Sequence, residues 1–421
     1  MSDDGGRRAR PTSKSLGASF WRLFASSTGS NLSDGILQAA LPLLAASLTR
    51  DPFLVSLVAS LAFLPWLLFA IPAGALVDRI DRRRAMQLAN LSRAVILVLL
   101  AVAVGAGLSS IGVLYAAAFL LGVAETVYDN AARAMLPRVV RRDQLERGNA
   151  LLSTAESVCN LFLGAPLGAL LFALSAMLPL GVAMALYVLA ALLIVTVRGS
   201  FAPERKAEHE RTTFTADIRE GLVWLMRHPI LRQLLWVTTI GGLGNSIANG
   251  VAVLFALEVL GIEEAGFGLL LATVGVGAVI GSIASPLLTR LLGRTAAMGV
   301  AATVGGLTLV AMGIWPTLVM TLIAWPLGAA AISAFNVQIM SVRQVLIPDA
   351  LFGRVQGAYR TVLWGSIPIG TAAGGAIASF SDIPTSLVVG GLLGAVSGVG
   401  VWLVLAVYRE RIAAAFLEEH A

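Results

Sequence analysis

The residues that could do chemistry in this sequence are a few polar and charged side chains placed inside long apolar runs. Asp34 has Asn31 and Gln38 on the same helical face, about one turn before and one turn after it. A buried carboxylate favours its neutral form, so Asp34 could take a proton from one compartment and release it to another. The alternative is that Asp34 only bonds a polar partner and thereby joins two helices.

A second set of charges follows in residues 125–133. Glu125, Asp129 and Arg133 recur every four residues, which places all three on one helical face. We predict that Glu125 is a second carboxylate for a proton or a substrate. Asp129 and Arg133 are expected to pair, either as a gate or as a structural clamp. Arg93 could pair with one of the acids of the first half, or its long side chain could only extend toward the inner membrane face.

The remaining candidates would line a binding cavity. Amide side chains in the second half could line such a cavity or bond neighbouring helices, and two tryptophans could stack on a lipophilic molecule. The predicted substrate-binding residues are Asn31, Gln38, Trp66, Glu156, Asn245, Asn249, Asn336 and Trp364. No acidic residue lies deep in the second half, so we expect any proton coupling in the first half, at Asp34 and Glu125.

Several other functions are disfavoured by what the sequence lacks. It has no G-x-x-x-x-G-K-[ST] phosphate-binding loop and no soluble domain large enough to hydrolyse ATP, so transport would be secondary. The three histidines lie in polar flanks, which argues against a buried metal site, and Cys159 is the single cysteine. No nucleophile–base pair is evident. We therefore expect no metal, no cofactor and no enzymatic activity.

These polar residues must be positioned by membrane-spanning helices. Of 421 residues, 57% are apolar and 13% are charged, whereas soluble chains carry roughly 25% charged residues. The mean hydropathy is +0.84. Each apolar run approaches the roughly 20 residues that a helix needs to cross a bilayer. The predicted spans are 23–48, 54–77, 85–107, 111–135, 149–173, 180–197, 232–260, 266–292, 296–314, 317–340, 355–380 and 385–407. The predicted fold class is an all-α membrane protein with about twelve transmembrane helices.

The distribution of charge predicts the orientation of these helices. Arginines recur in alternate connections, from residues 79–84 and 138–147 through the middle segment 198–227 to residues 409 and 411. The other connections hold a single basic residue, Arg50, among Asp51, Glu258, Glu263, Glu264 and Asp382. By the positive-inside rule, both termini are expected to be cytoplasmic. The net charge of +6 therefore reflects topology, and we expect no nucleic-acid partner.

The chain divides into two related halves. We predict an N-terminal tail (1–22), a six-helix bundle (23–197), a linker with an amphipathic helix (198–231), a second six-helix bundle (232–407) and a C-terminal tail (408–421). Residues 76–86 align without gaps to residues 288–298, and Gly164 and Gly168 fall on Gly370 and Gly374 at a similar offset. Two such repeats are typical of transporters that rock one half against the other around a midplane site.

The connection between the second and third predicted spans carries the most specific motif. Residues 74–83 read Gly-Ala-Leu-Val-Asp-Arg-Ile-Asp-Arg-Arg, which resembles the G-x-L-x-D-R-x-G-R-R signature of the major facilitator superfamily, with Asp81 in place of the second glycine. The resemblance covers essentially the whole chain. It implies two pseudo-symmetric six-helix bundles and a loop that locks the halves on the cytoplasmic side when the carrier opens outward. The implied gating residues are Gly74, Asp78, Arg79, Arg82 and Arg83, to which we add Asp129 and Arg133.

Further segments resemble the drug-efflux branch that includes enterobactin and macrolide exporters. They are Ser30–Gly35, Gly122–Asp129, Arg142–Ala150 and the glycine- and proline-containing Gly164–Gly168, which is associated with exporters. We therefore predict a proton-coupled exporter of small amphipathic molecules in the inner (plasma) membrane. Its partners would be the lipid bilayer, the substrate and protons, and the resemblance implies a monomer. The alternatives are a facilitator or importer of the same fold, and a membrane scaffold or sensor that has lost transport.

Overall fold

The computed structural model describes residues 15–77, 79–199, 201 and 214–418, and its regular elements over these residues are all helices. The first half contains α1 (Gly17–Leu48), α2 (Pro52–Val77), α3 (Arg82–Gly105), α4 (Ile111–Val139), η1 (Arg142–Gln144), α5 (Leu145–Ser157), η2 (Val158–Gly164), α6 (Ala165–Leu174) and α7 (Met177–Val195). The second half contains α8 (Phe214–Arg227), α9 (Pro229–Leu254), η4 (Phe255–Val259), α10 (Glu264–Leu292), α11 (Arg294–Ile314), α12 (Leu318–Leu346), α13 (Asp349–Phe380), α14 (Ile383–Val407) and α15 (Arg409–Glu418).

The number of membrane-crossing helices agrees with the number predicted from the sequence. Eleven helices of the described residues are long and apolar enough to cross a membrane, counting α5–η2–α6 as one and α9–η4 as one. Helix α1 is not among them, because Asn31, Asp34 and Gln38 lower the hydropathy of its C-terminal half. Its 32 residues are nevertheless long enough to span, at 1.5 Å per residue, and it packs inside the bundle. The prediction of about twelve spanning helices is confirmed.

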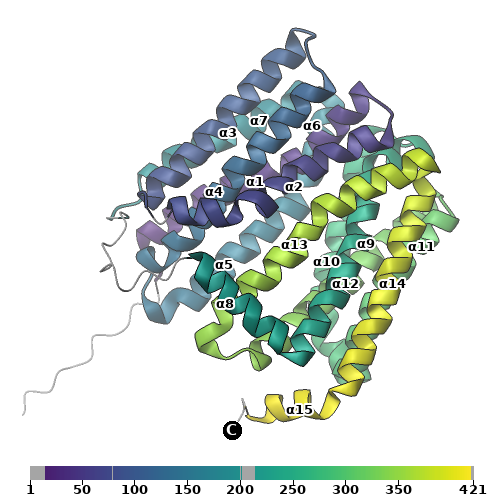
Figure 1. The fold of residues 1–421 in the computed structure, drawn as a ribbon. Helices are drawn as coiled ribbons and strands as arrows, with labels where there is room; N and C mark the ends of the chain where they lie inside the picture. The colour runs from purple at the N-terminus through teal and green to yellow at the C-terminus, as the bar shows by residue number, and fades with distance from the viewer. Residues whose placement is uncertain (1–14, 78, 200, 202–213, 419–421) are drawn as a thin grey trace, which may run out of the picture.

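The two halves lie side by side, with α2 and α13 adjacent at the middle of the molecule (Figure 1). Within each half, glycines bring helix backbones into close contact. A side-chain carbon at Gly168 would lie 2.9 Å from Cα of Ile36 on α1, and one at Gly374 would lie 3.0 Å from Cα of Ile247 on α9. The aligned glycines of the two repeats therefore perform the same packing, as small residues commonly do between membrane helices.

The halves are joined at the end of the bundle that carries Arg50, Asp51 and Glu258, which we call the far end. Arg50 pairs with Glu258 at 3.5 Å. The backbone N–H of Phe53 donates to Ser379 Oγ at 3.1 Å, and Ser60 Oγ donates to the Pro368 carbonyl at 2.7 Å. Helix α6 also packs against α10. These contacts close the far end.

The opposite end, which we call the basic end, carries the arginine-rich loops 79–84 and 141–147. Asp81, the residue that departs from the family signature, caps α3 by accepting a hydrogen bond from the backbone N–H of Arg84 at 3.0 Å. Its φ of −63° does not require glycine, which explains why aspartate is accepted there. Asp78 lies outside the described residues.

The gating residues that the structure describes contact their own half. The backbone N–H of Arg82 donates to the Phe201 carbonyl at 3.3 Å, and Arg83 Nη1 donates to the Val197 carbonyl at 3.1 Å. Arg79 is exposed, and Gly74 is buried in α2. Among the described residues, none of these three arginines makes a hydrogen bond or ion pair with the second half.

Helix α8 falls within the segment predicted as the linker, and it packs on the second half. Leu225 is fully buried in a cluster with residues of α9 and α13, and Glu220 pairs with Arg354 at 2.8 Å. The apolar face of this helix is therefore covered at least in part by protein.

Gly375→Val should open the seal at the far end. A side-chain carbon there would collide with Ser56 and lie 2.6 Å from the Pro52 carbonyl oxygen. Overpacking of this kind costs about 1–3 kcal/mol, and about 1.4 kcal/mol raises the ratio of open to closed molecules tenfold. In a Cys159→Ala background, a Ser60→Cys reporter should react about tenfold faster with an impermeant maleimide applied at the far end.

Gly353→Val is the matched control, because Gly353 lies on the same helix with open space around it. It should leave the labelling rate unchanged. Equal rates for Gly375→Val and the parent protein would show that the α2–α13 contact does not hold the far end closed.

Candidate functional site

The first-half site is built on an ion pair between α1 and α3. Arg93 Nη1 lies 3.2 Å from Asp34 Oδ1, and the two side chains are 1% and 11% exposed. The hydroxyl of Tyr187, on α7, donates to the same carboxylate oxygen at 2.5 Å. Arg93 therefore pairs with a first-half carboxylate and does not reach toward water, which settles the alternative left open by the sequence.

Aromatic rings complete the surroundings of Arg93. Its guanidinium carbon lies 5.1 Å from the ring centroids of both Tyr128 and Tyr187, within the range of a cation–π interaction. Arg93 Nη1 also lies 3.2 Å from Ser30 Oγ, and Ser30 donates to Asn90 at 3.1 Å. The Nε and Nη2 atoms of Arg93 are buried and have no hydrogen-bond partner among the residues that the structure describes. The guanidinium thus has donors to spare for a second carboxylate.

Glu125 supplies such a carboxylate nearby. A cavity of about 100 Å³ is lined by Asp34, Gln38, Phe63, Glu125 and Tyr187, among others. The charge of Glu125 interacts with the charges of Asp34 and Arg93. The structure therefore brings the two predicted proton-coupling residues to one cavity, together with Gln38.

A second cavity, of about 360 Å³, lies toward the basic end between the halves. It is lined by Asn31, Asp129, Arg133, Glu156, Arg360 and Trp364, among others. Asp129 and Arg133 pair at 3.6 Å, as predicted, although the Arg133 side chain is 53% exposed. Asn31 faces this cavity, so the polar stripe of α1 is divided between two cavities.

The two predicted tryptophans meet across the halves. Trp66 on α2 and Trp364 on α13 pack edge to face with centroids 5.3 Å apart. The guanidinium carbon of Arg360 lies 3.6 Å from the Trp364 centroid and 5.7 Å from the Trp66 centroid. Arg360 was not predicted as a site residue, although an arginine inside the predicted span 355–380 is a signal of the same kind as Asp34.

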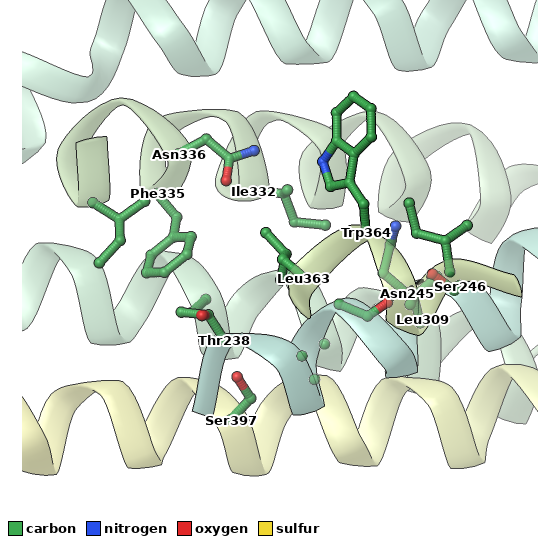
Figure 2. A pocket seen from close by; sticks show the side chains of 18 of the residues that line it. Thr238, Asn245, Ser246, Leu309, Ile332, Phe335, Asn336, Leu363, Trp364 and Ser397 are labelled. Atoms are coloured by element: carbon green, nitrogen blue, oxygen red, sulfur yellow. Dashed lines mark hydrogen bonds between the residues drawn. The ribbon is translucent and has the colours of Figure 1, made fainter. Parts of the chain in front are cut away.

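A third cavity, of about 260 Å³, lies within the second half (Figure 2). Asn336 and Trp364 lie along one side of it and Ser397 on the opposite side, with Phe335 and Leu363 between them. Arg343 also lines it, stacked 4.4 Å from the Tyr359 ring and donating to Gln356 at 3.1 Å. None of the described residues that line this cavity is acidic.

The predicted amides of the second half have different positions. Asn245 and Asn336 line the third cavity. Asn249 is exposed, donates to the backbone carbonyl of Asn245 at 2.9 Å and lies outside all three cavities. It therefore acts within α9 in this arrangement.

Solved transporters have the same architecture. The nucleoside transporter NupG superposes with a TM-score of 0.70 at 13% sequence identity, over 93% of this chain and 99% of NupG. A bacterial homologue of the iron transporter ferroportin superposes with a TM-score of 0.71 at 15% identity, over 91% and 98% of the two chains. At these identities the similarity establishes the fold alone.

Sequence comparison identifies the family. The multidrug efflux pump Tap of Mycolicibacterium fortuitum is 26% identical over 382 residues, which cover 86% of this chain and 89% of Tap. YvqJ, an uncharacterized MFS-type transporter of Bacillus subtilis (strain 168), is 22% identical over 353 residues, or 83% of each chain. Residues 11–414 match the family described as transmembrane secretion effector. The chain is a multi-pass membrane transporter and belongs to this family of the major facilitator superfamily.

Proposed function

We propose that this transporter is a proton-coupled antiporter that exports small amphipathic molecules across the plasma membrane. The observation that carries the proposal is that Asp34 and Glu125 line one buried cavity beside a single arginine, Arg93. Export is favoured by the similarity to Tap, a multidrug efflux pump. Among the residues that the structure describes, no charge of the second half is paired with this cluster, so we assign the coupling to the first half.

The coupling follows from counting charges. An arginine stays protonated in proteins, so Arg93 contributes one fixed positive charge. With Asp34 and Glu125 both ionised, the cluster carries a net charge of −1, and with one of them protonated it is neutral. A charge out of water is costly, so the empty cluster should hold one proton between the two acids. A substrate that binds nearby and offsets the negative charge then allows that proton to leave.

Arg93 provides a means for protonation to move helices. Within the described part of the chain its Nε and Nη2 atoms have no hydrogen-bond partner, while Nη1 donates to Asp34. Protonation of Asp34 weakens this ion pair and leaves Glu125, on α4, as the ionised acid. The guanidinium can then pair with Glu125, which shifts α1 relative to α3 and α4. We assign the link between the proton and alternating access to this exchange of partners.

The arrangement of the halves supports an inward-open state. The far end is closed by α2 with α13 and α6 with α10, and the second cavity lies toward the basic end. We place the basic end on the cytoplasmic side because its loops are rich in arginine. In the outward-open state the loop with Asp78, Arg79, Arg82 and Arg83 would hold the halves together there. Asp129 and Arg133 line this cavity, with side chains 20% and 53% exposed, and would take part in the same closure.

The function can be tested by accumulation of a fluorescent lipophilic cation in cells that express the protein. The parent protein should lower accumulation, and a protonophore should abolish this effect. Asp34→Asn should also abolish it, because it removes the proton site beside Arg93. Glu263→Gln is the matched control, since Glu263 is an exposed carboxylate of the far end, and it should export normally.

Other outcomes would redirect the proposal. Export by Asp34→Asn at the parent rate would contradict the assignment of Asp34. Higher accumulation in cells with the parent protein would indicate an importer. Unchanged accumulation of this and other amphipathic probes would favour a scaffold or sensor.

The ion pair itself can be tested by a double-mutant cycle. Removing one partner of a buried pair costs about 3–5 kcal/mol, because it leaves an uncompensated charge. Asp34→Asn and Arg93→Gln should therefore each lower the apparent melting temperature of the purified protein, and the double variant should be more stable than the sum of the two losses implies. Strictly additive losses would mean that the 3.2 Å contact is not energetically coupled.

A further inference from the structure

Arg360 occupies an unusual position between the two halves. Its guanidinium lies on the face of Trp364 and near Trp66, so two aromatic rings from different halves hold one cation. Arginine stacked on tryptophan is a favourable cation–π arrangement, and tryptophan is the best ring for it. The same two rings would hold any other cation of suitable size.

The charge of Arg360 is not neutralised by a direct partner. Among the described residues, Arg360 makes no hydrogen bond and no ion pair within 4 Å, although arginine readily forms bidentate pairs with carboxylates. The other two arginines near the first-half acids do pair, Arg93 with Asp34 and Arg133 with Asp129. Arg360 is therefore held mainly by the rings.

An unpaired acid faces the same space. Glu156 lines the second cavity with Arg360 and, among the described residues, has neither an ion pair nor a hydrogen bond. Its charge interacts with those of Arg360, Arg133 and Asp129. An acid and a cation that share a cavity of about 360 Å³ without direct contact leave room for a third charged group.

We propose that Trp66, Trp364 and Glu156 form a binding site for organic monocations, and that Arg360 occupies the position of the cation when no substrate is bound. An incoming cation displaces the guanidinium from the tryptophan face and pairs with Glu156. Trp364 also lines the third cavity, where Phe335, Ile332 and Leu363 offer an apolar wall (Figure 2). The apolar body of the substrate extends into this cavity.

This inference refines the proposed function by naming its substrate class. Binding and transport are nevertheless separable. A parent protein that binds the cation but does not export it would contradict the proposed function. A parent protein that binds the cation no more tightly than a neutral isostere would contradict this inference.

The test is equilibrium dialysis of the purified protein against three small probes, corrected with empty detergent micelles. The probes are phenyltrimethylammonium, its neutral isostere tert-butylbenzene, and the anion benzenesulfonate. The parent protein should bind the cation more tightly than the isostere. Arg360→Gln should tighten cation binding about five- to tenfold, the range of a cation–π contact, and leave the isostere unchanged.

Matched variants distinguish displacement of the Arg360 guanidinium from the general effect of removing a positive charge near the site. Arg343→Gln removes the arginine that lines the third cavity and is stacked on Tyr359. It should change cation binding much less than Arg360→Gln. Glu156→Gln and Trp364→Leu should each weaken cation binding selectively. The inference is overturned if Arg360→Gln and Arg343→Gln tighten cation binding equally. It is also overturned if Arg360→Gln leaves cation binding unchanged and weakens benzenesulfonate binding, which would make Arg360 an anion ligand.

Discussion

Arg93 places a fixed positive charge where water does not reach it, and much of the first half is arranged to compensate for that charge. A buried guanidinium requires a counter-charge and hydrogen-bond acceptors, or the fold loses several kcal/mol. Asp34 supplies the charge, Ser30 an acceptor, and the rings of Tyr128 and Tyr187 cover the remaining surface. These groups come from α1, α4 and α7, so one side chain on α3 fixes how four helices are rotated about their axes.

Close backbone packing holds this arrangement in place. Gly35 follows Asp34 directly, and a side-chain carbon there would lie 2.6 Å from the Cys159 carbonyl oxygen in η2. The π-helical segment η2 precedes Pro166, which cannot donate a backbone hydrogen bond. Widened turns of this kind are frequent at functional sites. Asp34 thus lies between the close helix contact at Gly35 and the cavity of about 100 Å³ that it lines with Glu125.

Much of the fold could be predicted from the sequence, because membrane helices are marked by hydropathy and their ends by arginine. The depth of Asp34 and Glu125 also follows from their places in the spans. The partners of these residues could not be predicted, because they depend on the rotation of one helix against another. Gln38 lines the same cavity as Asp34, whereas Asn31 lines the second cavity. Asn249 lies outside all three cavities and bonds within its own helix. Arg360 was detectable as a charge within a span, but its stacking on two tryptophans from different halves required the tertiary structure.

The central claim is that Asp34, Glu125 and Arg93 hold one exchangeable proton, and the most direct test is to count protons released on binding. A fluorescent lipophilic cation would be added to the purified protein in weakly buffered solution that contains a pH indicator. The parent protein and Glu263→Gln should each release about one proton per bound cation, because the cluster is neutral with one proton on its two acids. Glu125→Gln should bind the cation without releasing a proton, because its cluster is already neutral with Asp34 ionised. Release by Glu125→Gln at the parent stoichiometry, or no release by the parent protein, would contradict the account.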